Sequence, residues 1–145
     1  MAHVHDILLE KGDEVYTIGE GATVLEATQL MNRHKIGSLV VVRDEHVVGV
    51  FTERDVLRRV VAEHLDPETT RVRNVMTSKV VCCTPENTLN EVRSMMKRRK
   101  IRHLPVVDGG GDLVGVLSIG DLNAWSIHDG EVTIQYLHEY IYGRA

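Results

Sequence analysis

Residues 23–42 read TVLEATQLMNRHKIGSLVVV, and residues 88–107 read TLNEVRSMMKRRKIRHLPVV, which is the same pattern at an offset of 65 residues (88 − 23). A second pair of motifs follows: residues 49–55 read GVFTERD, and residues 115–121 read GVLSIGD, at an offset of 66 (115 − 49). One residue has therefore been added between the two motifs of the second copy. A tandem repeat of this kind predicts two similar halves, with the functional site between them.

The composition is that of an ordinary globular domain. The chain has 145 residues, of which 43% are hydrophobic and 26% are charged, as expected for one compact module. The net charge of −4 gives no general attraction to nucleic acid. No apolar run approaches the length that spans a membrane, and the first fifteen residues lack the apolar region of a signal peptide. We therefore expect a cytoplasmic protein with no membrane partner.

Each half shows the order strand, helix, strand, strand, helix. The strands of the first half are expected over residues 15–18, 39–42 and 47–51, and those of the second half over residues 80–83, 104–107 and 113–117. The first helix of each half opens on a threonine that is followed three residues later by glutamate, Thr23 with Glu26 and Thr88 with Glu91. This spacing predicts a capping box at each helix start. The second helices are expected to begin near Thr52 and Ser118. The pattern predicts an α+β fold of two tandem β-α-β-β-α repeats.

The chain divides into a first repeat over residues 1–66 and a second repeat over residues 67–145, with the polar segment 66–73 connecting them. Because so short a repeat buries too little surface to be stable alone, we expect one joint core and one module. Residues 130–145 carry apolar residues at helical spacing, which predicts an amphipathic C-terminal helix. That helix either packs on its own module or forms a dimer contact.

The sequence gives little support for metal or redox chemistry. Cys82 and Cys83 are adjacent in a predicted strand, so their side chains are expected to point to opposite faces and to act as small apolar residues. The eight histidines are scattered, and no metal-binding motif is present. We predict no metal site and no catalytic cofactor.

The repeated motif after the third strand of each half carries the functional signal. Thr52 and Asp55, and again Ser118 and Asp121, place a hydroxyl three residues before a carboxylate at a helix start. Such a hydroxyl can donate to a phosphate at the helix N-terminus, and a carboxylate accepts hydrogen bonds from the hydroxyls of a ribose. The same spacing is also that of an ordinary N-terminal cap. Two copies in matched repeats favour the ligand site.

These motifs, LVVV with GVFTERD, IRHLPVVD with GVLSIGD, and NVMT at the start of the second half, resemble a tandem pair of CBS domains, or Bateman module, of the stand-alone bacterial type. The resemblance spans almost the whole chain. It implies that the two repeats pack sheet to sheet about a pseudo-twofold axis and leave two clefts between them. In this family the clefts hold adenosine-containing ligands such as AMP, ADP, ATP, S-adenosylmethionine or NAD(H).

The resemblance also implies which residues line each cleft. The first cleft would be formed by Val50, Thr52, Arg54, Asp55, Thr77, Val80, Ile101, Arg102, His103 and Pro105. The second cleft would be formed by Val15, Ile36, Gly37, Ser38, Leu39, Val116, Ser118 and Asp121. The aspartates would hold ribose, the hydroxyls would reach toward phosphate, and the apolar side chains would enclose adenine. The first cleft has more cations and is expected to take more phosphate charge, and Val40 stands where the second repeat has Pro105.

Two function classes remain open after this reading. The first is an adenine-nucleotide-binding regulatory or energy-sensing module, with AMP favoured over ATP and NAD(H), which signals to a separate partner protein and forms a homodimer. The second is a ligand-independent dimerisation or interaction module. Catalysis is not expected, because neither motif supplies a nucleophile with a supporting base. The basic run over residues 97–100 ends a helix, where cations complement the dipole, so a nucleic-acid partner is not favoured.

Overall fold

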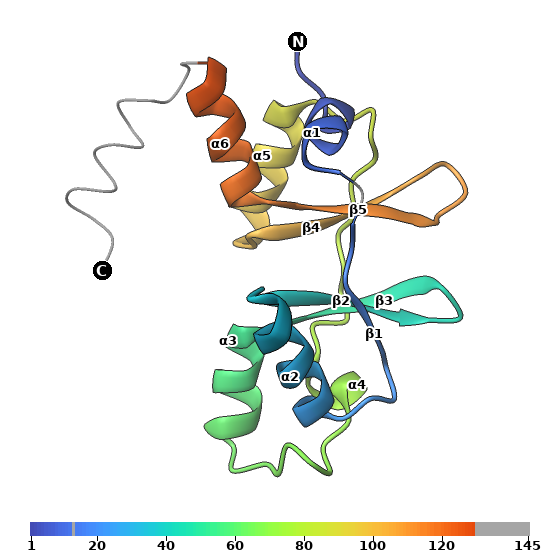
Figure 1. Ribbon diagram of the computed structural model, residues 1–145, viewed down its shortest axis with the longest axis vertical. Helices are drawn as coiled ribbons and strands as arrows, with labels where there is room; N and C mark the ends of the chain where they lie inside the picture. Colours follow the sequence, from blue (N-terminus) through green and yellow to red (C-terminus); the bar gives the residue numbers. More distant parts are fainter. Residues whose placement is uncertain (13, 130–145) are drawn as a thin grey trace, which may run out of the picture.

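The computed structural model describes residues 1–12 and 14–129 and shows two α+β halves whose sheets face each other, with the helices on the outer sides (Figure 1). The elements are α1 (Val4–Lys11), β1 (Thr17–Gly19), α2 (Val24–His34), β2 (Ser38–Arg43), β3 (His46–Thr52), α3 (Glu53–Asp55), the π-helix η1 (Val56–Val61), α4 (Val72–Val75), α5 (Leu89–Arg99), β4 (His103–Val107), β5 (Leu113–Ser118) and α6 (Ile119–Asp129). The predicted fold class is confirmed. The predicted C-terminal helix over residues 130–145 lies outside the described residues.

The first sheet has the order β1-β2-β3. Strand β1 runs parallel to β2, with Thr17 opposite Val40, and β2 pairs antiparallel with β3. Asp44 and Glu45 form the two-residue turn of this hairpin, with φ of 50° and 68°. Two left-handed residues give the turn a backbone twist that matches the twist of the flanking strands. The first strand was expected over residues 15–18 and forms instead over Thr17–Gly19.

The second sheet contains only β4 and β5, so the strand predicted over residues 80–83 is wrong. What remains of it is one parallel bridge between Cys83 and Val106. The Cys83 amide donates to the Pro105 carbonyl at 3.0 Å, and the Val107 amide donates to the Cys83 carbonyl at 2.9 Å. Pro105 has no amide hydrogen, so it cannot donate to the Val81 carbonyl, which would be the next hydrogen bond of this parallel pairing.

The two predicted capping boxes differ. At Thr88 the box is complete, with the Thr88 hydroxyl accepting from the Glu91 amide at 3.1 Å and the Glu91 carboxylate accepting from the Thr88 amide at 2.9 Å. At Thr23 only the hydroxyl half forms, to the Glu26 amide at 3.1 Å. The segment between the halves crosses the start of α2, where the Val24 amide donates to the Thr70 carbonyl at 2.9 Å and the Leu25 amide donates to the Pro67 carbonyl at 3.0 Å. The connection is therefore packed against the first half.

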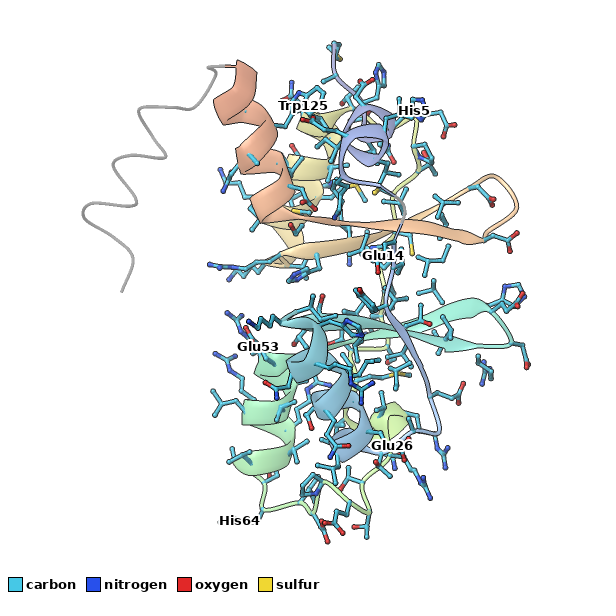
Figure 2. All side chains as sticks on the ribbon, viewed as in Figure 1. His5, Glu14, Glu26, Glu53, His64 and Trp125 are labelled. Carbon is cyan, nitrogen blue, oxygen red and sulfur yellow. The ribbon has the colours of Figure 1, made fainter. Side chains whose placement is uncertain are left out.

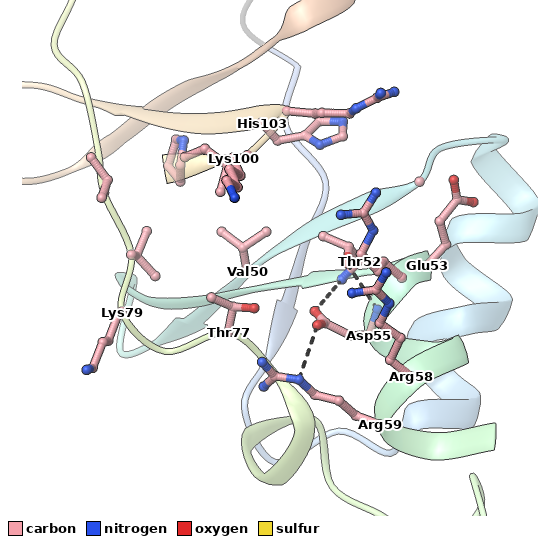
Figure 3. A pocket seen from close by; sticks show the side chains of 17 residues that line it. Val50, Thr52, Glu53, Asp55, Arg58, Arg59, Thr77, Lys79, Lys100 and His103 are labelled. Carbon is pink, nitrogen blue, oxygen red and sulfur yellow. Dashed lines mark hydrogen bonds and ion pairs between the residues drawn. The ribbon is translucent and has the colours of Figure 1, made fainter. Parts of the chain in front are cut away.

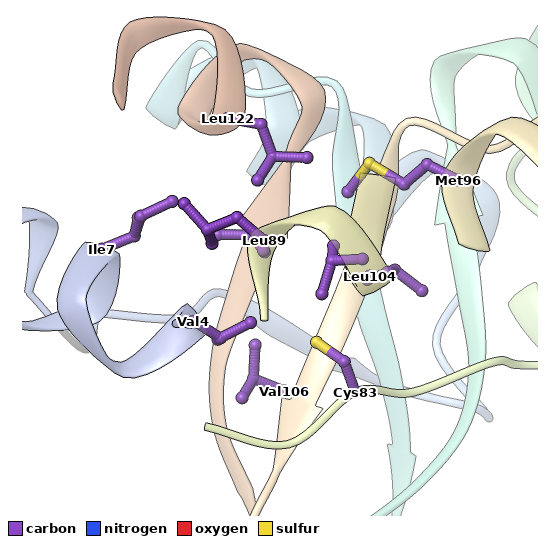
Figure 4. Close-up of a cluster of buried hydrophobic side chains, with 10 residues drawn as sticks. Val4, Ile7, Cys83, Leu89, Met96, Leu104, Val106 and Leu122 are labelled. Atoms are coloured by element: carbon purple, nitrogen blue, oxygen red, sulfur yellow. The ribbon is translucent and has the colours of Figure 1, made fainter. Parts of the chain in front are cut away.

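Each half has its own buried cluster, so the expectation of one joint core is wrong. The first cluster packs α2, β2, β3 and η1 around Leu39, Val41 and Phe51. The second packs α5, β4, β5 and α6 around Leu104 and Leu117 (Figure 4). Because each sheet has helices packed on its outer face, apolar burial is completed twice rather than once.

The halves are joined by an exchange of short helices. Helix α1 comes first in the chain, yet its Val4 and Ile7 lie in the core of the second half (Figure 4). Helix α4 precedes the second half, yet its Val72 and Val75 lie in the core of the first. Figure 2 shows His5 of α1 and Trp125 of α6 in the same half, and Glu14 and Glu53 near the space between the halves. The boundary at residue 66 remains a prediction.

Candidate functional site

A cavity of about 380 Å³ lies where the C-terminal end of β3 and the start of α3 face the second half. It is lined by Gly37, Val50, Thr52, Glu53, Arg54, Asp55, Arg58, Arg59, Thr77, Lys79, Val80, Val81, Lys100, Ile101, Arg102, His103 and Pro105 (Figure 3). All ten residues predicted for the first cleft lie on this wall. The structure thus brings together residues from both repeats, and their role as ligand contacts remains a prediction.

Thr52 and Asp55 form the polar corner of this cavity. The Asp55 amide donates to the Thr52 hydroxyl oxygen at 3.2 Å, and the Thr52 amide donates to Asp55 Oδ2 at 3.0 Å. Asp55 is only 7% exposed, and its Oδ1 lies 3.6 Å from Nε of Arg59. The hydroxyl therefore keeps its own hydrogen for donation, and the carboxylate keeps lone pairs that a ligand hydroxyl can use.

Part of the cavity lining is apolar. Val50, Val80, Ile101 and Pro105 are among the lining residues, and Figure 3 shows Val50 projecting from β3 into the cavity. Val50 and Thr77 exchange two backbone hydrogen bonds, at 3.0 Å and 2.9 Å. This bridge fixes the connection between the halves to the edge of β3. An apolar slot with a few polar groups at one end is typical of a small-molecule site.

The rim of the cavity is strongly cationic. Its basic side chains are Arg54, Arg58, Arg59, Lys79, Lys100 and Arg102, and its carboxylates are Glu53 and Asp55. Sequence reasoning missed Arg58, Arg59, Lys79 and Lys100, together with the lining residues Glu53 and Val81, and it assigned Gly37 to the second cleft, whereas Gly37 lines this cavity. The signal for two of them was present in the spacing, because Arg58 follows Arg54 by four residues and Arg59 follows Asp55 by four.

His103 lies between the two predicted clefts. Burial lowers the pKa of its imidazole below the ordinary 6.5, and nearby Lys11 and Arg102 act in the same direction, while Asp121 and Glu53 oppose it. An imidazole with a lowered pKa is neutral at physiological pH. It can then accept or donate one hydrogen bond to a ligand without adding charge to the cavity.

The residues predicted for the second cleft are arranged differently. Ser118 and Asp121 repeat the reciprocal bonds of Thr52 and Asp55, at 2.8 Å and 3.0 Å. Asp121 Oδ2, however, also accepts from Nζ of Lys11 at 2.8 Å, and the same ammonium donates to the Val116 carbonyl at 2.9 Å. The second carboxylate is thus already paired with a cation.

The opposite wall of the second cleft is scattered. The side chain of Leu39 is buried in the core of the first half, which leaves only its backbone for a ligand. Ile36 and Gly37 line a second hollow, beside Thr28 and Lys35, and Gly37 also lines the 380 Å³ cavity. Val15, which precedes β1, and Ser38, the first residue of β2, are partly buried. None of Val116, Ser118 and Asp121 lines the 380 Å³ cavity.

Over residues 1–12 and 14–129, no group of three or more His, Cys, Asp or Glu side chains is placed to hold a metal ion. Within the same described part of the chain, no helix combines the length and apolarity needed to cross a bilayer. Burial raises the pKa of the Cys83 thiol to about 12, which makes it a poor nucleophile.

Two tandem α+β repeats, stacked sheet to sheet with a cation-rimmed cleft between them, define a class of paired-repeat modules. The chain belongs to the CBS domain family, whose model matches residues 4–62 and again residues 72–127. The mitochondrial CBS domain-containing protein CBSX3 of Arabidopsis thaliana is 34% identical over 126 residues, which are 83% of this chain and 61% of that relative. The chain therefore spans less than two thirds of that protein.

Solved structures agree with this assignment. A CBS-domain protein from Burkholderia ambifaria MC40-6 superposes with a TM-score of 0.84 at 38% identity, covering 92% of this chain and 99% of the other. A CBS domain pair in complex with 5′-methylthioadenosine and S-adenosyl-L-methionine superposes with a TM-score of 0.79, covering 89% of this chain and 98% of the other. That pair is 22% identical to this chain, so the likeness is one of fold.

Proposed function

We propose that this chain is a regulatory module that binds an adenine nucleotide in the cavity between its repeats and passes the binding state to a separate partner protein. The observation that carries the proposal is the juxtaposition of a hydroxyl–carboxylate corner, an apolar slot and a cationic rim in one cavity of about 380 Å³. Each of the three parts suits a different part of a nucleotide. CBS domain pairs are generally regulatory rather than catalytic, and no catalytic step is proposed.

In this proposal the apolar slot and the buried carboxylate of Asp55 bind the nucleoside. The flat apolar face of adenine suits the space beside Val50, Ile101 and Pro105. Asp55 lies at the end of this slot with one oxygen bound only to the Thr52 amide and the other 3.6 Å from Arg59. A buried carboxylate can accept from both vicinal hydroxyls of a ribose, which favours a ribonucleoside over a deoxyribonucleoside and over purely apolar ligands.

In this proposal the Thr52 hydroxyl and the cations of the rim bind the phosphates. The hydroxyl of Thr52 accepts from the Asp55 amide and retains its hydrogen for a phosphate oxygen. Arg54, Arg58 and Lys79 are exposed at the mouth of the cavity, where they would neutralise phosphate charge. AMP needs the fewest of these cations and remains the favoured ligand, and the number of spare cations also accommodates ATP or NAD(H).

Fold likeness supports an adenosyl ligand. The CBS pair solved with 5′-methylthioadenosine and S-adenosyl-L-methionine has two ligands that share an adenosyl group. The cavity of this chain has the apolar lining and the carboxylate that an adenosyl group requires. Signalling then follows from differential affinity, because a ligand shifts a conformational equilibrium only when it binds one state more tightly than another.

A second candidate is a ligand-independent dimerisation module. Thr52 and Asp55 satisfy each other as a helix cap, so their presence has a structural reason apart from any ligand. Leu57 and Val61 of η1 are 62% and 61% exposed, four residues apart on one face. An exposed apolar pair of this kind favours a homodimer contact, which is compatible with either function.

A thermal-shift panel separates the two candidates. The protein would be melted with adenosine, AMP, ADP, ATP, NAD⁺, NADH and S-adenosylmethionine, with GMP as the control for the base. A ligand that binds only the native state raises its melting temperature in a saturable way. A saturable rise with an adenosyl ligand and none with GMP is expected. A flat panel would overturn the nucleotide function and leave the dimerisation module.

A further inference from the structure

The short helices α1 and α4 occupy equivalent places in the two halves. Helix α1 begins after a bridge between His3 and Thr88, and α4 begins after a bridge between Thr23 and Arg71. In each half the glycine of the GV motif contacts the residue that follows the last buried residue of the short helix. Gly49 lies against Met76, which follows Val75, and Gly115 lies against Leu8, which follows Ile7. Leu8 therefore corresponds to Met76, at an offset of 68 (76 − 8).

The chain after these equivalent residues differs in length. Four positions separate Met76 from Val80, whereas seven separate Leu8 from Val15, and the two valines correspond in the repeat. The additional residues let α1 run for 8 residues, Val4–Lys11, where α4 has 4, Val72–Val75. Lys11, which stands in the last turn of the longer helix, therefore belongs to a stretch that the second repeat lacks.

Lys11 replaces a backbone contact by a side-chain contact. In the first half the Val50 carbonyl accepts from the Thr77 amide at 2.9 Å. In the second half the equivalent carbonyl, at Val116, accepts from Nζ of Lys11 at 2.9 Å. The same ammonium lies 2.8 Å from Asp121 Oδ2, and the two side chains are 34% and 23% exposed.

This contact changes what the second carboxylate can do. Asp121 Oδ2 accepts from both the Ser118 amide and Lys11, whereas Asp55 has its arginine neighbour at the longer distance of 3.6 Å. The Lys11 ammonium already has two acceptors, so a ribose must break a charge-assisted pair to reach the carboxylate. The side chain of Lys11 also stands beside the Val116 backbone, the counterpart of the Val50 backbone in the open cavity.

We propose that Lys11 closes the second nucleotide site as a built-in cation, so that the chain binds one nucleotide, at the first cavity. The inference rests on the proposed nucleotide function and adds the number of sites and the residue that sets it. Displacement of Lys11 opens the second site. The two halves are similar in fold but unequal in function, because the second repeat has no residue equivalent to Lys11.

The test is the number of AMP molecules bound per chain, measured by isothermal titration calorimetry on the full chain. The parent protein is expected to bind one. Lys11→Ala, which removes the cation and clears the space, is expected to bind two, and Lys11→Arg, which keeps a cation, is expected to bind one. Lys97→Ala makes the same change in net charge on the exposed face of α5 and is expected to bind one.

A double variant ties the second molecule of AMP to the predicted carboxylate. Lys11→Ala with Asp121→Ala is expected to return to one AMP per chain, since the group that holds ribose is gone. One AMP bound by both the parent and Lys11→Ala overturns the closure by Lys11 and leaves the nucleotide function intact. Two bound by the parent overturns it as well. No binding by any variant overturns the nucleotide function, and the inference with it.

Discussion

Arg59 joins the buried Asp55 to the segment that links the two repeats. Its Nε lies 3.6 Å from Asp55 Oδ1, and its Nη1 donates to the Met76 carbonyl at 3.0 Å. Met76 directly follows α4 and precedes Thr77, which pairs with Val50. Arg59 thus contacts both Asp55 and the connection between the halves. Under the proposed regulatory function, these contacts would be a physical route from a ligand at Asp55 to the connection.

Asp55→Asn tests the assignment of the carboxylate to ribose. Asparagine still accepts a backbone amide at a helix N-terminus, so the cap and the fold are expected to survive. The ligand bonds lose their charge assistance, which weakens adenosine binding by about 1 kcal/mol, roughly fivefold. Calorimetric titration with adenosine measures the loss. Asp121→Asn is the matched control and should leave this affinity unchanged; an equal loss there would place the nucleoside in the other half.

Thr52→Val tests whether the hydroxyl serves a phosphate or only its helix. Valine has the same shape and removes the hydroxyl that accepts from the Asp55 amide. We expect AMP to bind more weakly by about 1 kcal/mol, the worth of a typical hydrogen bond, with adenosine almost unaffected. Thr52→Ser should restore AMP binding. If adenosine and AMP lose the same affinity, the hydroxyl acts only as the cap.

The order of helices and strands and the spacing of Thr52 and Asp55 could be predicted because they depend on local patterns, whereas the other residues expected in the clefts were implied by the family resemblance. Helix starts at Thr23 and Thr88, hairpin strands and the position of Thr52 before a helix follow from spacing and capping alone. The strand over residues 80–83 failed because the missing donor belongs to Pro105, a distant residue opposite it. The contact of Lys11 with Asp121 spans 110 residues. No local pattern signals it, since it depends on α1 packing on the other half.

Arg58→Met tests the contribution of a cation that sequence reasoning missed. The guanidinium is exposed on the cavity rim, so its effect is screened and should be modest, about two- to fivefold for a polyphosphate. The loss is expected to rise in the order AMP, ADP, ATP and to shrink as salt is added. Affinities at two ionic strengths measure it. Arg33→Met, in the last turn of α2 and away from this cavity, is the control.

His103 predicts a pH dependence of stability. Burial holds the pKa of the folded imidazole below the ordinary 6.5, so the unfolded chain binds this proton more readily than the folded one. The resulting stabilisation is fully present above pH 6.5 and is lost as the pH falls toward the folded pKa. Urea unfolding of the parent and of His103→Asn, compared between pH 5 and pH 7.5, should show a shallower decline in the variant. Parallel curves would contradict the prediction, and His46→Asn on the exposed hairpin controls for the loss of any histidine.

Gly49→Ala tests the close approach of the connecting segment to β3. A Cβ at this position would overlap Sδ of Met76 and lie 3.0 Å from the Thr77 carbonyl oxygen. That oxygen is fixed by the Val50 amide at 3.0 Å, so it cannot yield without breaking the bridge. We expect the free energy of unfolding to fall by about 1–3 kcal/mol, measured by urea denaturation.

Two matched glycines separate crowding from the general effect of adding a methyl group. At Gly115 the new Cβ would meet only the end of the Leu8 side chain, at 2.8 Å, which can change rotamer, so the loss should be smaller than at Gly49. At Gly109 nothing lies within 4 Å, and alanine should be neutral or slightly stabilising because it restricts the unfolded chain. Equal destabilisation at all three positions would mean that the contact between Gly49 and Met76 does not limit how closely the connecting segment packs.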